Sequence, residues 1–158
     1  ISVDWVKALG ANPTPLPFPE LYAALEQGAV DAQENPVTVI AANKLYEVQK
    51  YMTLTNHQYN PQSVIISKKF WDTLSAAEKK IVEDAAQESA KYQREQARGQ
   101  VAGALELVKK SGMQVNELPG AELTKLVQKV SPVITKYAGT VGESTVSDLL
   151  AELAKVRK

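Results

Sequence analysis

The chain reads FPELYAALEQGAVDAQENP between residues 18 and 36. Apolar residues at helical spacing predict a helix over residues 20–27 that ends at Gly28. A short apolar run and a polar cluster follow, closed by Pro36; the cluster holds Asp31, Gln33, Glu34 and Asn35. Polar side chains beside apolar ones are typical of a pocket wall. The alternative is a loop whose side chains cap its own backbone.

Composition narrows the class of protein. The chain has 158 residues, 44% of them hydrophobic, which is enough for one ordinary core and short for two independent ones. The 18 basic and 18 acidic residues balance, so no net field favours nucleic acid. The absence of cysteine excludes disulfides, thiolate metal sites and a cysteine nucleophile. No apolar run approaches the roughly 18 residues of a membrane span.

The first residue is Ile1 rather than methionine, and no signal-peptide pattern follows it. We therefore expect that the chain begins inside a longer polypeptide or after processing.

Periodicity and turn residues divide the rest of the chain into helices and strands. Helical spacing predicts four further short helices, over residues 2–9, 37–48, 123–137 (interrupted at Pro132) and 144–156. Strand-forming residues predict strands at 51–55, 63–67 and 113–118. Residues 56–62 then form a loop between the first two strands, and we interpret it as functional.

The longest expected element begins at Ser75, which forms a capping box with Glu78, and continues to about Lys110. A helix of that length extends about 50 Å and would cross more than one packing unit. Gly99 and Gly103 inside it predict either a bend or a close helix crossing.

Catalytic patterns are sparse. The sequence has one histidine, no glycine-rich phosphate loop after a strand and no acid pair at a recognisable spacing. We expect no enzyme activity, no metal site and no cofactor. Taken alone, His57 fits a hydrogen-bonded structural histidine, Phe18 a core aromatic and Gln62 a solvated loop residue.

Several stretches in register favour a functional interpretation. They are LGANPTPLPF at 9–18, ELYAALEQ at 20–27, VDAQENP at 30–36, YEVQKY at 46–51, LTNH at 54–57 and SKKF at 67–70. Together they resemble the solute-binding proteins of tripartite ATP-independent periplasmic (TRAP) transporters, of the dicarboxylate and sialic-acid type. The resemblance covers the whole chain, more weakly after about Val101, and implies the C-terminal half of such a protein.

The fold that this resemblance implies is α/β. It is a partial two-lobed, periplasmic-binding-protein-like fold with hinge strands and one long helix crossing both lobes. Residues 1–60 would be a second-lobe segment with the ligand-binding motif, and residues 61–100 would return to the first lobe. Residues 101–158 would be a C-terminal helical segment that packs back on the second lobe.

The resemblance also implies a site for a small organic acid. Phe18 would pack on the ligand, and Asn35 would hydrogen-bond its carboxylate or a neighbouring polar group. Glu34 and Gln62 would line the same cleft, with His57 close by. The implied partners are the acid and the membrane subunits of a TRAP transporter, and the implied location is the periplasm. The family takes dicarboxylates, sialic acid, sugar acids and aromatic acids.

One family feature is absent. The arginine that clamps the ligand carboxylate in this family would lie upstream of Ile1, and we interpret Arg94 and Arg98 as solvated or lobe-packing charges. We therefore expect the isolated chain to bind its acid weakly or not at all, unless the missing N-terminal half is supplied by another chain. Two alternatives stay open: a small enzyme, and a self-associating or partner-completed structural fragment without ligand binding.

Overall fold

The computed structural model describes residues 1–156, which fall into two compact units. The central unit comprises residues 25–116, and the terminal unit joins residues 1–24 to the chain from 117 onward. The opening stretch forms a short 3-10 helix η1 (Phe18–Glu20) and α2 (Leu21–Glu26). Gly28 follows with φ +68°, a conformation that glycine adopts without strain. The predicted helix and its end at Gly28 are confirmed.

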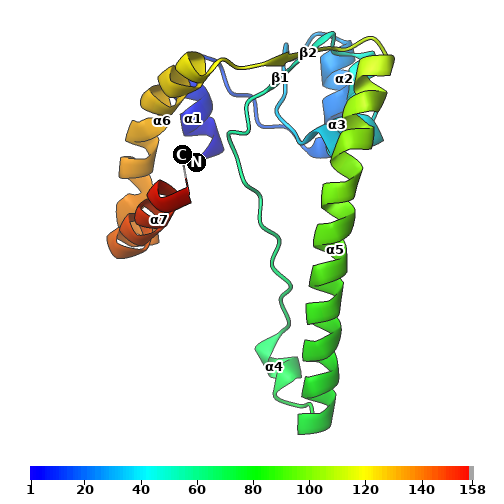
Figure 1. Cartoon of the computed structure of the whole chain (residues 1–158), viewed down its shortest axis with the longest axis vertical. Coiled ribbons are helices and arrows are strands. Elements are labelled where there is room, and N and C mark those ends of the chain that lie inside the picture. The colour runs from blue at the N-terminus through cyan, green and yellow to red at the C-terminus, as the bar shows by residue number, and fades with distance from the viewer. Residues whose placement is uncertain (157–158) are drawn as a thin grey trace. The chain divides into compact units, whose positions relative to one another are not determined.

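A small hydrophobic core organises the central unit. α3 (Val37–Ala42) packs against α5 (Ala76–Lys110), as Figure 1 also shows. The buried hydrophobic side chains are Leu25, Ile40, Leu45, Val108 and Met113. They come from α2, α3, the 3-10 helix η2 (Leu45–Glu47), the C-terminal end of α5 and the residue after its glycine stop. The loop of residues 31–36 therefore lies between α2 and α3, which both contribute to this core.

The long helix α5 is confirmed at 35 residues. The Ser75 Oγ accepts from the Glu78 backbone N–H at 3.3 Å, and the Glu78 carboxylate accepts from the Ser75 N–H at 2.8 Å. This reciprocal pair satisfies amide donors that a helix start leaves free. Apart from the adjoining residues and the backbone of the helix itself, nothing lies within 4 Å of a Cβ added at Gly99 or Gly103, so the described residues make no close crossing there.

The helix expected over residues 37–48 is wrong beyond Ala42. α3 ends there, and Lys44 adopts the left-handed conformation with φ 54° before η2 begins. The side chain and the backbone N–H of Asn43 both donate to the Val39 carbonyl oxygen at 3.0 Å, at the end of the helix. The turn is followed by Leu45, which is 1% exposed, so tertiary burial outweighs local helical spacing here.

Two of the three expected strands are confirmed. β1 (Tyr51–Leu54) and β2 (Gln114–Glu117) pair in a two-stranded sheet. The strand expected at 63–67 is wrong: this segment has no strand pairing, and Ile65 is 88% exposed. Strand propensity reflects how well a side chain fits a paired, half-buried surface, and no strand of the described structure offers that pairing. Residues 56–67 therefore run without helix or strand from β1 to α4 (Figure 1).

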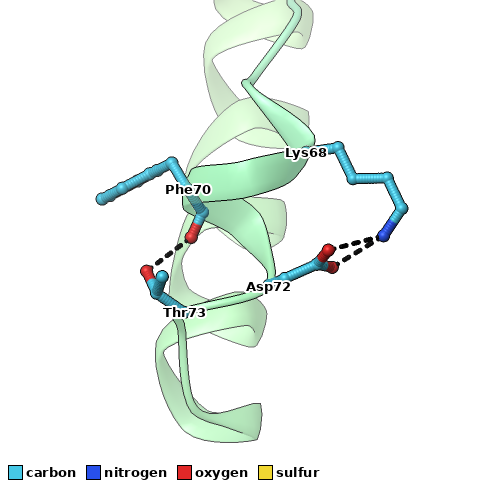
Figure 2. A network of polar contacts seen from close by, with 4 residues as sticks. All are labelled: Lys68, Phe70, Asp72 and Thr73. Atoms are coloured by element: carbon cyan, nitrogen blue, oxygen red, sulfur yellow. Dashed lines mark hydrogen bonds and ion pairs between the residues drawn. The ribbon is translucent and has the colours of Figure 1, made fainter.

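A single-turn helix, α4 (Lys68–Trp71), follows this segment. Figure 2 shows its two local contacts: Lys68 Nζ pairs with the Asp72 carboxylate at 2.7 Å, and the Thr73 hydroxyl donates to the Phe70 carbonyl oxygen at 2.7 Å. The ion pair spans one helical turn and is exposed at both ends, so it supports the turn only weakly. The Phe70 carbonyl oxygen also accepts from the Thr73 backbone N–H at 3.0 Å, so the hydroxyl adds a second hydrogen bond to it.

The terminal unit is helical. α1 (Ser2–Ala8) packs against α6 (Gly120–Val141), and α6 packs against α7 (Glu143–Val156). The expected interruption at Pro132 is wrong, because α6 continues through it. A proline inside a helix leaves the carbonyl four residues earlier without its amide donor. Here the Ser131 hydroxyl donates to that carbonyl, of Gln128, at 2.9 Å.

α1 is held on α6 by a cluster of three polar side chains. The Asp4 carboxylate accepts from Lys136 Nζ at 2.8 Å and from the Tyr137 hydroxyl at 2.5 Å. The Lys136 bond, and then the Tyr137 bond, lower the pKa of Asp4 from its ordinary 3.8. The bond to Asp4 raises the pKa of Lys136 and that of Tyr137.

These shifts predict how the terminal unit responds to pH. The folded-state pKa of Asp4 is lowered. The stability that Asp4 contributes to the folded state is therefore fully present above its unfolded-state pKa, and it is lost as pH falls through the folded-state pKa. Lys136 and Tyr137 behave in the opposite way, because their folded-state pKa values are raised. The stability that they contribute is present below their ordinary pKa values and is lost as pH rises through the raised folded-state values. Asp4→Asn should flatten the acid limb of thermal unfolding measured between about pH 2 and 5. An unchanged acid limb would show that the cluster does not support folding.

Candidate functional site

Phe18 begins η1 in the terminal unit and has 46% of its surface exposed. Pro17 caps η1, and Pro19 occupies its second position, so two ring-constrained residues restrict the backbone on either side. The side chain is not sealed in a packed interior. The interpretation of Phe18 as a core aromatic is therefore wrong, and its exposed face is available to a ligand.

Glu34 and His57 are brought together in the central unit. The Glu34 Oε2 lies 3.3 Å from the His57 Nε2, and the side chains are 44% and 35% exposed. The Thr55 Oγ1 lies 2.6 Å from the other ring nitrogen, Nδ1. Because a carboxylate only accepts hydrogen bonds, this arrangement favours a proton on Nε2, with Nδ1 of a neutral ring accepting from Thr55. The ring is thereby oriented from both sides.

Asn35 contacts a different neighbour. Its Nδ2 donates to the Gln33 Oε1 at 2.7 Å, and both residues are half-buried. Asn35 precedes Pro36, which restricts its backbone to extended conformations. Pro36 caps α3, and its carbonyl oxygen accepts from Val39 and Ile40 at 2.9 and 3.0 Å. The amide of Asn35 is therefore carried directly on the start of a helix that belongs to the core.

The loop of residues 31–36, which carries Glu34 and Asn35, is also held at its first residue by a hydrogen bond. The Gln49 side chain donates to the Asp31 carbonyl oxygen at 3.3 Å. Gln62 lies in the extended segment, is exposed, and makes no hydrogen bond or ion pair with the other candidates in the described part of the chain. The structure thus pairs Glu34 with His57 and gives Asn35 a separate partner.

Two residues of this arrangement were not in the predicted site. Gln33 stood in the polar cluster without an assigned role, and its spacing of two from Asn35 was the available signal. Thr55 carried no signal beyond its place two residues before the single histidine. The candidate groups of the central unit are amides, one carboxylate and one imidazole, which can orient a polar solute but hold no permanent positive charge.

Arg94 and Arg98, the two arginines considered as ligand clamps, lie on α5 and are both exposed. None of the helices within residues 1–156 combines the length and apolar character that a membrane crossing needs.

With this geometry established, comparison with known proteins assigns the class. Residues 1–140 match the family described as bacterial extracellular solute-binding protein, family 7. The sialic acid-binding periplasmic protein SiaP of Vibrio cholerae is 35% identical over 150 residues, which are 95% of this chain and 46% of SiaP. The chain therefore belongs to the family 7 bacterial extracellular solute-binding proteins.

Two solved structures support the assignment. A TRAP periplasmic solute-binding protein from Ochrobactrum anthropi, with its C-terminus bound in the ligand-binding pocket, is 55% identical with a TM-score of 0.89. The alignment covers 99% of this chain and 49% of that protein. The sugar acid-binding protein DctPAm of Advenella mimigardefordensis, in complex with galactonate, is 39% identical with a TM-score of 0.89, covering 99% of this chain and 50% of that protein.

The comparisons confirm the resemblance to TRAP solute-binding proteins and the partial two-lobed, α/β binding-protein fold. The chain spans about half the length of the relatives that it matches. The family and its neighbours are solute-binding transport proteins rather than enzymes, and SiaP is periplasmic.

Proposed function

We propose that this chain supplies part of a periplasmic TRAP solute-binding protein that captures a small organic acid and delivers it to the membrane transporter. The observation that carries the proposal is the polar loop 31–36, which presents Glu34 paired with His57 and Asn35 paired with Gln33 in a chain of this family. The acids named for two similar proteins, sialic acid and galactonate, support the choice of ligand class.

The chemistry of the loop suits orientation of an acid better than neutralisation of its charge. An asparagine amide can donate to a carboxylate or exchange hydrogen bonds with a hydroxyl group. Phe18 would add an apolar face, and Gln62 a further amide. A desolvated anion needs a cation as well, and exposed Arg94 and Arg98 are poorly suited to that role. We therefore propose that an N-terminal half, like the part of the relatives that this chain does not cover, completes the site and supplies the charge-balancing cation.

Capture would proceed by closure of two lobes. A ligand that contacts both lobes only in the closed state stabilises that state by its differential affinity. We assign residues 1–60 to the second lobe, 61–100 to a segment returning to the first lobe, and 101–158 to a segment packing back on the second. The loop 56–62 is the candidate hinge, and Asn56 already adopts a left-handed backbone with φ 45°, which asparagine tolerates.

A second candidate is a partner-completed or self-associating fragment that binds no ligand. It is favoured by the apolar side chains of the extended segment, where Val64 and Ile65 are 76% and 88% exposed. Contiguous exposed apolar groups commonly mark an interaction surface. The same segment serves the first proposal if the missing half covers it.

One experiment separates these functions. We expect the isolated chain to show no micromolar binding of sialic acid or galactonate by titration calorimetry. A chimera in which this chain replaces the matching half of the Ochrobactrum anthropi protein should bind at least one of them. Micromolar binding by the isolated chain would contradict the assignment of the cation to the other half. A chimera that folds as a compact monomer in sedimentation and binds neither acid would contradict acid capture for these ligands and favour the fragment.

A further inference from the structure

Residues 58–66 connect β1 to α4 without forming a helix or a strand (Figure 1). Within residues 1–156, none of their backbone N–H or carbonyl groups hydrogen-bonds to another backbone group. All of these residues are exposed, so water can satisfy the backbone in the isolated chain. The segment therefore keeps backbone donors and acceptors that a neighbouring strand could use.

The side chains of this segment are those of a strand with two covered faces. Residues 62–67 read QSVIIS, with no charge and three consecutive β-branched residues. In a strand, Val64 and Ile66 would point to one face and Ile65 to the other. These side chains are 76%, 44% and 88% exposed. Apolar side chains on both faces are typical of a strand in a sheet that is covered on both sides.

We propose that residues 62–67 are an interaction surface that adds a strand to a β-sheet of an N-terminal half, like the part of the relatives that this chain does not cover. In strand addition, backbone hydrogen bonds supply affinity and alternate side chains supply specificity. The proposal rests on the proposed function only for the existence of that half, and no acid needs to be bound. The strand expected at 63–67 then forms when the sheet is present.

The relatives contain enough additional chain to cover the segment. The Ochrobactrum anthropi protein aligns with 99% of this chain over 49% of its own length, with a TM-score of 0.89. About as much chain again is therefore present in that protein. A second copy of this chain fits less well, because pairing residues 62–67 of two copies gives a two-stranded ribbon. Such a ribbon is marginally stable and leaves both apolar faces without a covering layer.

The elements that follow the segment add to the same apolar surface. Phe70 on α4 and Ile81 and Tyr92 on α5 are 53%, 68% and 63% exposed. All five buried core residues of the described chain lie outside residues 59–92. Exposed apolar side chains in this part of the central unit are therefore not covered by its own core, and such groups commonly mark an interaction surface.

Hydrogen exchange followed by mass spectrometry tests the strand in the isolated chain and in the chimera, both without ligand. In the isolated chain, the peptide covering residues 62–67 should exchange as fast as an unstructured peptide. In the folded chimera, it should exchange about 100-fold more slowly, because strand pairing protects its amides.

Three results would overturn the proposal. The first is a folded, monomeric chimera in which residues 62–67 exchange as fast as in the isolated chain. The second is slow exchange in the isolated chain together with a dimer in sedimentation, which would assign the segment to a second copy. The third is failure to fold both of this chimera and of one built with the matching half of DctPAm, because residues 62–67 would then fit neither half.

Ile65→Lys tests the side chain in both contexts. In the isolated chain, where Ile65 is 88% exposed, it should change the midpoint of thermal unfolding by no more than about 1 °C. In the chimera, it would place a charge on a covered face and should lower the midpoint by about 5–10 °C. Gln128→Lys, at an exposed position of α6, should shift the midpoint by less than about 2 °C in both.

Equal effects of Ile65→Lys in the isolated chain and the chimera would also overturn the proposal. A chimera that protects residues 62–67 but binds neither sialic acid nor galactonate would support the strand and count against the proposed function. The exchange measurement and the acid titration therefore fail independently.

Discussion

Leu45→Ala is expected to lower the free energy of unfolding of the central unit by about 2–5 kcal/mol. Leu45 is 1% exposed and is one of five buried hydrophobic residues in residues 1–156. Removing its side chain loses buried apolar surface and leaves a cavity that neighbouring groups fill only in part. In so small a core, no second layer of side chains compensates for the loss. Urea unfolding followed by far-ultraviolet circular dichroism measures the change.

The matched control is Leu107→Ala. Leu107 lies on α5 beside Val108 but is 44% exposed, so its truncation should cost about 1 kcal/mol or less. Both variants make the same leucine-to-alanine change, so the comparison shows how much of the loss comes from burial of Leu45. Equal losses for the two variants would show that the buried cluster does not hold the central unit together.

The largest expected effect on binding is that of Asn35→Asp in the chimera. The substitution keeps the size of the side chain, removes both amide donors and places a negative charge at the proposed acid site. Loss of the donors together with repulsion of an anionic ligand should weaken galactonate binding about 100-fold, which corresponds to about 2.7 kcal/mol. Titration calorimetry near neutral pH measures it.

Gln87→Glu provides the same change of charge at an exposed position of α5, outside the loops proposed for binding. It should alter galactonate affinity by less than about threefold, because an exposed charge is screened by solvent and salt. If Asn35→Asp binds galactonate as tightly as the parent chimera, Asn35 does not face the ligand. If both variants lose affinity equally, the effect of charge is general rather than specific to Asn35.

Elements with local signals were predictable from the sequence. The capping box of Ser75 and Glu78 marks the start of α5, and Gly112, two residues after Lys110, marks its end. Both were predictable because the groups that begin and end a helix are its near neighbours in the chain. Gly28 ends α2 for the same reason. The three wrong predictions have other causes. The helix stops before Lys44 because Leu45 is buried, and α6 continues through Pro132 with a hydrogen bond from Ser131 to the carbonyl that the proline leaves unpaired. Residues 63–67 form no strand because a strand needs a paired neighbour.

The site was predictable in part. Its residue types came from the resemblance. Glu34 lies 3.3 Å from His57, and their sharing of a ligand site stays a prediction. The roles of Gln33 and Thr55 could not be predicted, because a hydrogen-bond partner depends on side-chain direction and on contacts such as that between Gln49 and Asp31, distant in sequence. The three-segment lobe assignment stays a prediction.

The pairing of β1 with β2 has a consequence for how the chain folds. These two strands are hydrogen-bonded neighbours although all of α4 and α5 separates them in sequence. Helix formation in α5 needs only local contacts and is fast, whereas a long-range pairing must first meet the entropic cost of closing the intervening loop. A rigid helix changes that cost, since it constrains where the two strand segments can meet. The sheet is therefore expected to be the last part of the central unit to form and the step that limits its folding rate.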